Sequence, residues 1–178
     1  MEDRQLECLT DDLAARFQYT IEMSQEAVFW LERNGQFSYV NDQACRSLGY
    51  TRDELLSLFL WDVDFDFQRD QWREHWNNLQ KTGKINLETT HCRKDGYIFP
   101  VEVSAFQVTF KGKEFHAAFV QDITERKLAS DILKKSESLY RSLFEHVPDG
   151  ILVANQESYY LDANPMMCRM LGYRHDEL

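Results

Sequence analysis

The first side chains that could do chemistry are three aspartates spaced two residues apart, Asp62, Asp64 and Asp66. Three carboxylates so close together could bind a hard cation such as Ca²⁺, which prefers oxygen ligands. The segment lacks the glycine and the closing bidentate glutamate of an EF-hand loop, and Val63 and Phe65 alternate with the acids. We therefore expect a loop with short helical turns along the edge of a core, and no metal site.

Sulfur and imidazole ligands are not spaced for a metal either. The cysteines form no Cys-x-x-Cys pair, which predicts reduced thiols with a packing role. His91 directly precedes Cys92, and neighbouring residues of a strand point to opposite faces, so these two side chains cannot bind the same metal ion. His75 falls on an apolar stripe, where a histidine is either a core residue with satisfied nitrogens or a ligand to a bound group. The four cysteines are Cys8, Cys45, Cys92 and Cys168.

No residues have the spacing of a catalytic or nucleotide-binding motif. The sequence has no P-loop, no glycine-rich nucleotide lid and no diguanylate cyclase signature. None of its five histidines stands in the phospho-acceptor helix motif of a kinase. The sequence therefore predicts a module that is not itself an enzyme.

Composition narrows the class further. The formal net charge of −10 leaves no basic footprint for nucleic acid. No apolar run approaches the roughly 20 residues that span a bilayer, and the acidic N-terminus does not resemble a signal peptide. We expect a cytoplasmic chain of one or two domains, without membrane contact from this segment.

A repeat organises the chain. Residues 41–55 read NDQACRSLGYTRDEL and residues 164–178 read NPMMCRMLGYRHDEL, with nine of fifteen positions identical. So long a match at one fixed offset indicates a repeated structural unit. We expect one complete domain, a connector, and the opening part of a second domain of the same kind.

Periodicity and turn residues predict the elements that position these side chains. The turn at Asn34-Gly35 is expected to place both residues at positive φ. The pattern shift from Ala105 to Phe106 suggests a bulge or coil there. The last strand is apolar on both faces, so it should be central. The expected helices are 9–23, 42–48, a short one that starts at the Thr51–Glu54 capping box, 70–81 and 123–145, and the expected strands are 27–33, 36–40, 84–93, 97–110 and 114–121.

The helix over 123–145 is expected to start at a capping box. Asp122 would be the N-cap, and Glu125 would reach back to it. Leu128, Ile132, Leu139 and Leu143 then form an apolar stripe, which Lys135 and Ser136 interrupt. This pattern predicts either a weak coiled coil or a helix that packs on its own domain.

The order of these elements resembles a PAS (Per-Arnt-Sim) domain. FWLERNGQFSYVNDQACRSLGYTRDEL resembles the PAS core, and HCRKDGYIFPVEVSAF with GKEFHAAFVQDITERK resembles the PAC segment that closes such domains. The similarity covers residues 13–127, and again 137–178. It implies an α+β fold: a five-stranded antiparallel sheet of order 2-1-5-4-3, with helices on one face and a C-terminal signalling helix.

The resemblance also implies a division of the chain. Residues 1–23 would be an N-terminal helical cap and 24–124 the PAS/PAC domain. Residues 125–146 would be the linker or signalling helix, and 147–178 an incomplete second PAS domain. The function implied is a sensory or interaction module of a sensor histidine kinase or diguanylate cyclase. Residues expected to transmit the signal are Asp122, Thr124, Glu125, Leu128 and Ile132.

Cofactor expectations also follow from the resemblance. The family's flavin branch uses an Asn-Cys-Arg motif beyond the segment matched here by Arg52-Asp53-Glu54, and no cysteine follows that segment, so a flavin–cysteine adduct is rejected. Haem-binding members use a histidine on the helix that carries His75. The aromatic residues either fill the core or enclose a small organic ligand; the candidates are Phe29, Trp61, His75, Trp76 and Phe119.

The expected partners are of three kinds. By resemblance the chain forms a homodimer, passes its signal to an output domain of the same polypeptide, and possesses a pocket for a small-molecule ligand if its aromatic residues do not fill it. No nucleic-acid partner is expected.

Overall fold

The computed structural model describes residues 15–177 and divides into two compact units, Met1–Thr124 and Glu125–Leu178. Residues 15–22 are helical, which agrees with the end of the helix expected over 9–23; residues 9–14 lie outside the described residues.

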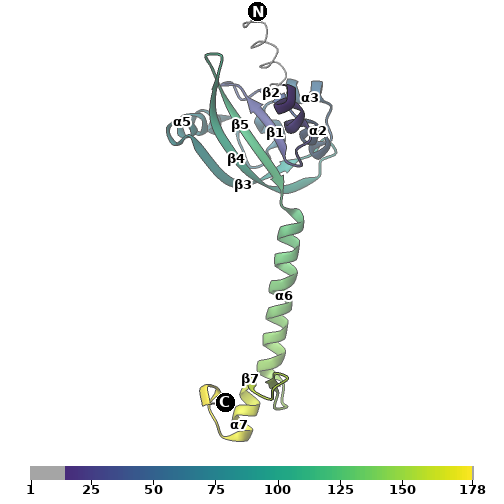
Figure 1. The fold of residues 1–178 in the computed structure, drawn as a ribbon, viewed down its shortest axis with the longest axis vertical. Helices are drawn as coiled ribbons and strands as arrows, with labels where there is room; N and C mark the ends of the chain where they lie inside the picture. The colour runs from purple at the N-terminus through teal and green to yellow at the C-terminus, as the bar shows by residue number, and fades with distance from the viewer. Residues whose placement is uncertain (1–14, 178) are drawn as a thin grey trace, which may run out of the picture. The chain divides into compact units, whose positions relative to one another are not determined.

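The first unit is built on one antiparallel sheet. Its strand order is β2-β1-β5-β4-β3, with β5 in the centre, as the sequence predicts (Figure 1). β5 is central because it pairs with β1 on one side and β4 on the other. The strands are β1 (Ala27–Leu31), β2 (Phe37–Val40), β3 (Lys84–Cys92), β4 (Ile98–Phe110) and β5 (Lys113–Asp122).

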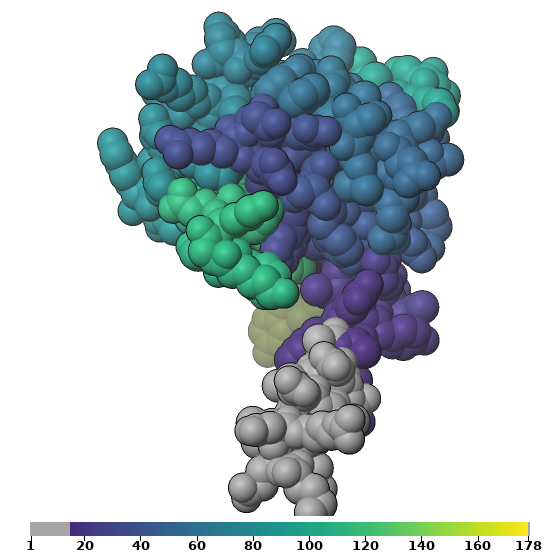
Figure 2. Space-filling view, turned by 90° about the horizontal axis from the view of Figure 1, so that it is seen from above, coloured from purple at the N-terminus to yellow at the C-terminus, as the bar shows by residue number. Residues whose placement is uncertain are grey.

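Four helices and a 3-10 turn connect β2 to β3. Gly49 ends the first of them at φ 75°, and the Thr51–Glu54 capping box, with both bonds present, starts the next. The helices are α2 (Asp42–Leu48), α3 (Arg52–Ser57), α4 (Leu60–Val63) and α5 (Trp72–Thr82), with the turn η1 (Arg69–Gln71) before α5. Figure 2 shows this segment, in blue and teal, packed together on one face of the unit.

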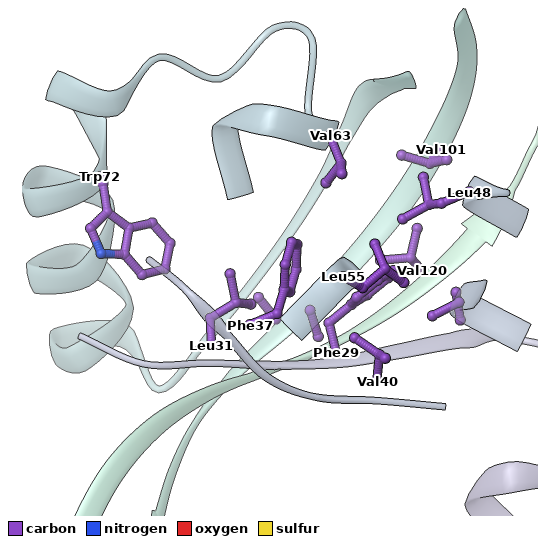
Figure 3. Packing of buried hydrophobic residues seen from close by; sticks show 14 of the residues in the cluster. Phe29, Leu31, Phe37, Val40, Leu48, Leu55, Val63, Trp72, Val101 and Val120 are labelled. Carbon is purple, nitrogen blue, oxygen red and sulfur yellow. The ribbon is translucent and has the colours of Figure 1, made fainter. Parts of the chain in front are cut away.

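The core lies between the helices and one face of the sheet, called here the inner face. Phe29 and Leu31 of β1 and Phe37 of β2 belong to one cluster of buried side chains with Trp72 of α5 (Figure 3). Each of these side chains is at most 6% exposed. At about 25 cal/mol per Å² of buried apolar surface, this layer is the main stabilising term of the unit.

β4 runs without interruption, so the predicted bulge near Ala105 and Phe106 is wrong. The register with β3 and with β5 advances one residue at a time through this point. The hydrophobic pattern shifts for another reason: Phe99, Val101 and Ala105 belong to the inner face, whereas Phe106 begins an apolar patch on the outer face.

The hairpin between β1 and β2 forms, but its turn differs from the one predicted. Among the described residues other than glycine, only Lys111 and Ser158 have positive φ, so Asn34 does not. The amide of Gly35 donates to the carbonyl of Glu32, and Gly35 alone is left-handed, at φ 85°. The turn is therefore a type I turn followed by a glycine, the form typical of a hairpin with a G1 bulge.

A polar network attaches helix 15–22 to the rest of the unit. Glu22 receives both terminal nitrogens of Arg52, at 3.1 and 3.0 Å, and the hydroxyl of Tyr39, at 2.8 Å. Arg52 also donates to Asp42 at 2.6 Å. The hydrogen bond from Arg52 lowers the pKa of Glu22, while burial and then Glu22 raise the pKa of Tyr39 to about 12.

The second unit repeats the start of the first. Asn164 occupies the place of Asn41 and makes the matching bonds: its Oδ1 accepts from Ile151 and Met167, and its Nδ2 donates to Asp149. Ser158 takes the left-handed place of Gly35 at φ 67°. The elements are α6 (Thr124–His146), β6 (Leu152–Ala154), β7 (Tyr160–Ala163), α7 (Pro165–Leu171) and the 3-10 turn η2 (His175–Glu177).

Candidate functional site

A cavity of about 50 Å³ lies between the inner face of the sheet and helices α4 and α5. Most of its wall is apolar, because the inner-face positions of the strands carry aliphatic and aromatic side chains. Four polar side chains interrupt the wall: Asp64, His75, His91 and His116. The apolar lining residues are Phe29, Leu31, Phe37, Leu60, Phe67, Trp72, Leu87, Val103, Ala105, Ala118 and Val120.

The three histidines come from three elements. His91 on β3 is 4% exposed and His116 on β5 is 1% exposed, while His75 on α5 is half-buried. His116 stacks on Trp76, with ring centroids 3.9 Å apart and planes 9° apart, and its centroid lies 5.7 Å from that of His75. His91 stands edge-on to Phe29, with centroids 6.3 Å apart. Burial lowers the pKa of all three imidazoles, so each is neutral near pH 7.

Asp64 borders the cavity through the loop after α4. Its Oδ1 accepts the hydroxyl of Thr89 at 2.7 Å and the amide of Asp66 at 3.1 Å. Burial raises its pKa above the usual range. Asp66 accepts the hydroxyl of Thr90, and Asp62 caps α4 by accepting the amide of Phe59. Asp64 and Asp66 therefore attach the loop after α4 to β3, whereas Asp62 only caps α4. No group of metal-ligating residues occurs among residues 15–177.

The structure brings together only part of the predicted pocket. Phe29 and His75 line the cavity. Trp61 lies outside the cavity and stacks on Phe59 at a centroid distance of 5.0 Å. Trp76 stacks on His116 and does not line the cavity either. Phe119 is on the outer face, edge-on to Phe106, so its placement in the pocket is wrong. The reason is the phase of β5, which turns its even-numbered residues inward.

Sequence reasoning missed His91 and His116 as cavity residues. The alternation of inward and outward side chains along a strand could have identified both. His91 is in phase with Leu87 on β3, and His116 is in phase with Ala118 and Val120 on β5. The phase of β5 alone did not identify the inner face, because both of its faces are apolar.

The buried histidines predict a loss of stability in mild acid. Burial lowers the pKa of His91 to about 4, and burial with a smaller effect of His75 lowers the pKa of His116 to about 3. The folded pKa values lie below the unfolded value of about 6.5, so stability present above pH 6.5 is lost as the pH falls toward them. Between about pH 7 and pH 5.5 we expect the free energy of unfolding to fall by about 2 to 3 kcal/mol.

Urea unfolding followed by tryptophan fluorescence measures this change, because all four tryptophans belong to the first unit. His116→Phe should remove about half of this 2 to 3 kcal/mol, since the values for His91 and His116 give them similar shares. His146→Gln, at an exposed position of α6, is the control and should leave it unchanged. A pH dependence in His116→Phe equal to that of the wild type would contradict the assignment.

The residues expected to transmit a signal lie at the end of β5 and on α6. Oδ1 of Asp122 accepts the amide of Thr124 at 2.9 Å and its hydroxyl at 2.6 Å, and Oδ2 lies 3.7 Å from Arg93 at the end of the β3–β4 hairpin. The intervening Ile123 is 2% exposed, and its amide donates to Pro100. The start of α6 is thus held to two strands.

The other three are Glu125, Leu128 and Ile132. Glu125 is exposed in the first turn of α6. Leu128 and Ile132 are 57% and 68% exposed. Their apolar stripe is therefore not used for packing within the described residues.

Haem does not fit this cavity. Pockets for organic ligands of drug size have volumes of roughly 300 to 1,000 Å³, and a haem is at the upper end of that size class. The space beside His75 is about 50 Å³. A haem would have to displace the aromatic layer formed by Phe67 and Trp72, which are packed edge to face at 6.2 Å.

The fold and the cavity define an α+β module with a small, mostly apolar cavity and a helix that follows its central strand. Comparisons with known proteins identify it. A family model described as "PAS domain" matches residues 25–125, and a second PAS model matches 138–178. The chain belongs to the PAS domain family, and its first unit is a PAS sensory module of the kind found in signal-transduction proteins.

Two curated proteins and one solved structure illustrate the relationship. Sporulation kinase E of Bacillus subtilis (strain 168) is 23% identical over 99% of this chain and 24% of its own length. The methyl sulfide methyltransferase-associated sensor of Methanosarcina acetivorans is 27% identical over 64% of this chain and 12% of its own length. A PAS domain of a two-component sensor histidine kinase is 32% identical, covers 63% of this chain and 98% of its own, and has a TM-score of 0.55.

The chain thus spans about a quarter of the length of the first curated relative and about an eighth of the second. In residues 15–177 no helix combines the length and the apolar character needed to cross a membrane.

Proposed function

We propose that this chain is the sensory segment of a sensor kinase, in which the PAS unit detects a small molecule and passes the change to an output domain through α6. The observation that carries the proposal is the junction at Asp122. One carboxylate contacts both the first turn of α6 and Arg93 of the β3–β4 hairpin. A shift of β3 or β4 around an occupied cavity would therefore change the start of α6.

The relatives support a kinase as the parent protein. The two curated relatives are named as a kinase and a sensor, and the related solved domain comes from a sensor histidine kinase. A binding event can shift the output only through a difference in affinity between two arrangements of the module. The cytoplasm, where such kinases meet their partners, is the proposed location.

We further propose that the working form is a homodimer. Exposed apolar side chains on α6 support this, because a single helix gains nothing from an apolar stripe in water. Phe17 in helix 15–22 is 62% exposed and adds a second apolar surface. The outer face of the sheet adds a third, where Trp30 lies 5.5 Å from Phe115 and Phe110 is 52% exposed.

Dimerisation provides the test. Leu128→Gln and Phe17→Gln should each weaken self-association at least tenfold, as measured by sedimentation velocity over a concentration series, because each removes an exposed apolar contact of about 1.5 kcal/mol or more. Lys134→Gln, on the same helix, is the matched control and should leave the dissociation constant unchanged. If both test variants associate as the wild type does, helix-mediated dimerisation is wrong.

A further inference from the structure

His116 is a buried polar side chain without a hydrogen-bond partner in the described part of the chain. It is 1% exposed, and neither of its ring nitrogens has a hydrogen-bond partner among residues 15–177. A buried polar group normally has a hydrogen-bond partner, because without one it loses its hydrogen bonds to water and gains none in the protein. The ring borders the cavity, and it stacks on Trp76.

The charge of the cavity wall restricts what could complete those contacts. Among residues 15–177 no lysine or arginine lines it, and its three imidazoles are neutral near pH 7. An anion would enter without a counter-charge. Oδ1 of Asp64, the acid in the wall, already accepts two hydrogen bonds, and burial raises its pKa, so a charged partner would lose its hydration for little attraction. The wall favours an uncharged occupant.

Size and hydrogen bonding restrict it further. A water molecule needs about 10 to 15 Å³ of such space, so about 50 Å³ admits about four non-hydrogen atoms. A neutral imidazole offers one N–H donor and one acceptor nitrogen. A hydroxyl group both donates and accepts, and the surrounding Leu31, Val103 and Ala118 suit a short hydrocarbon tail.

We propose that this cavity binds a compact, uncharged organic molecule of about four non-hydrogen atoms, with a hydroxyl-type group hydrogen-bonded to His116 and a short apolar tail against the strands. The inference rests on the proposed sensory function and gives it a ligand class. His75 and His91 line the same space and supply further donor and acceptor sites for the polar end.

Nuclear magnetic resonance of the full chain tests the proposal with propan-1-ol as the probe. The methyl signal of Ala118 reports occupancy, and the ring nitrogens of His116 report the hydrogen bond. We expect both to shift and to saturate together. Propionate and propylammonium have nearly the same size but carry a charge, and each should bind at least tenfold more weakly than the alcohol.

Two variants separate the hydrogen bond from the cavity itself. His116→Phe keeps a ring stacked on Trp76 and should weaken propan-1-ol at least tenfold, while xenon, which needs only apolar space, binds as before. His146→Phe, on the exposed surface of α6, is the control and should change neither. Ala105→Val narrows the cavity and should weaken both probes, which keeps the proposal testable if His116→Phe does not fold.

Three results would overturn the proposal: equal affinity of propan-1-ol for His116→Phe and wild type, binding of the charged probes as tight as that of the alcohol, or no saturable shift with any probe, in which case the cavity holds water only. Its failure is distinct from failure of the proposed function. The loss of dimerisation in Leu128→Gln does not depend on any ligand, so either result can stand without the other.

Discussion

Replacing Asn41 with alanine is expected to lower the free energy of unfolding of the first unit by about 4 kcal/mol. Asn41 is fully buried. Its Oδ1 accepts from the amides of Val28 and Ala44, and its Nδ2 donates to the carbonyls of Ile21 and Glu26. Alanine would leave four backbone groups without these partners and would remove the N-cap of α2, worth about 1 kcal/mol by itself.

Tryptophan fluorescence during urea unfolding measures the effect in the first unit. Asn164→Ala is the matched control, because it removes the same side chain from the equivalent place in the second unit. It should leave the fluorescence transition within about 0.5 kcal/mol of the wild type, as expected for a site in the other compact unit, which contains no tryptophan. A loss below about 1 kcal/mol in Asn41→Ala would show that water replaces the amide.

Asn41 also has a consequence for signalling. Of the groups it joins, Ile21 lies in the last turn of helix 15–22, Glu26 precedes β1 and Ala44 lies in α2. Loss of the amide should therefore weaken the attachment of helix 15–22, which then depends on the bonds of Glu22 to Arg52 and Tyr39. Amide hydrogen exchange should become faster in that helix than in β5, because local opening proceeds at a lower cost than global unfolding.

Much of the fold is readable from local chemistry. Gly49 and Thr51 specify a helix end and a helix start two residues apart, and both appear with the expected bonds. Such signals work because backbone groups at helix ends must be satisfied nearby, whatever the rest of the chain does. The strand order is a different matter: it follows from the family resemblance together with the two apolar faces of β5.

The cavity is less predictable because it depends on which face of a strand is inside. In β5, Phe119 is the larger apolar residue and His116 the polar one, so hydrophobicity alone assigns them the wrong way round. Phe119 instead packs on Phe106 across the outer face. A polar residue enters the core only where neighbours or an occupant satisfy it, which a single strand pattern does not reveal.

The turn after β1 shows how a correct element can be predicted for an incorrect reason. Asn34-Gly35 marks a hairpin, and the hairpin forms, but only Gly35 is left-handed. Asn34 instead accepts the amide of Gln36 with its Oδ1. An Asn-Gly pair allows two turn types, and the contacts of the glycine, which are long-range, select between them.

Those contacts give Gly35→Ala a large expected effect, a loss of about 3 kcal/mol in the free energy of unfolding. The φ of 85° costs an alanine about 1 kcal/mol or more. A Cβ at this position would also lie 2.6 Å from Cζ3 and 2.9 Å from Cη2 of Trp61, so the indole would have to move. Overpacking of a fitted core typically costs 1 to 3 kcal/mol.

Gly96→Ala isolates the first of these costs. Gly96 has nearly the same φ, 87°, in the β3–β4 turn, and, its two chain neighbours aside, no atom of the described residues lies within 4 Å of the place its Cβ would take. We expect a loss of about 1 kcal/mol there, from backbone strain alone. If both substitutions lower the free energy of unfolding equally, as measured by the same urea unfolding, the Trp61 indole moves aside without an energetic cost.

A double-mutant cycle with Trp61→Leu then connects the turn to the cavity. Leucine removes the indole atoms that the new Cβ would meet, so the loss from Gly35→Ala should be smaller in that background by about 1 to 2 kcal/mol. The carbonyl of Gly35 also accepts the amide of Leu60 at 2.9 Å, and Leu60 lines the cavity. An indole pushed away by Gly35→Ala would carry α4 with it, so this variant should weaken propan-1-ol binding, whereas Gly96→Ala should not.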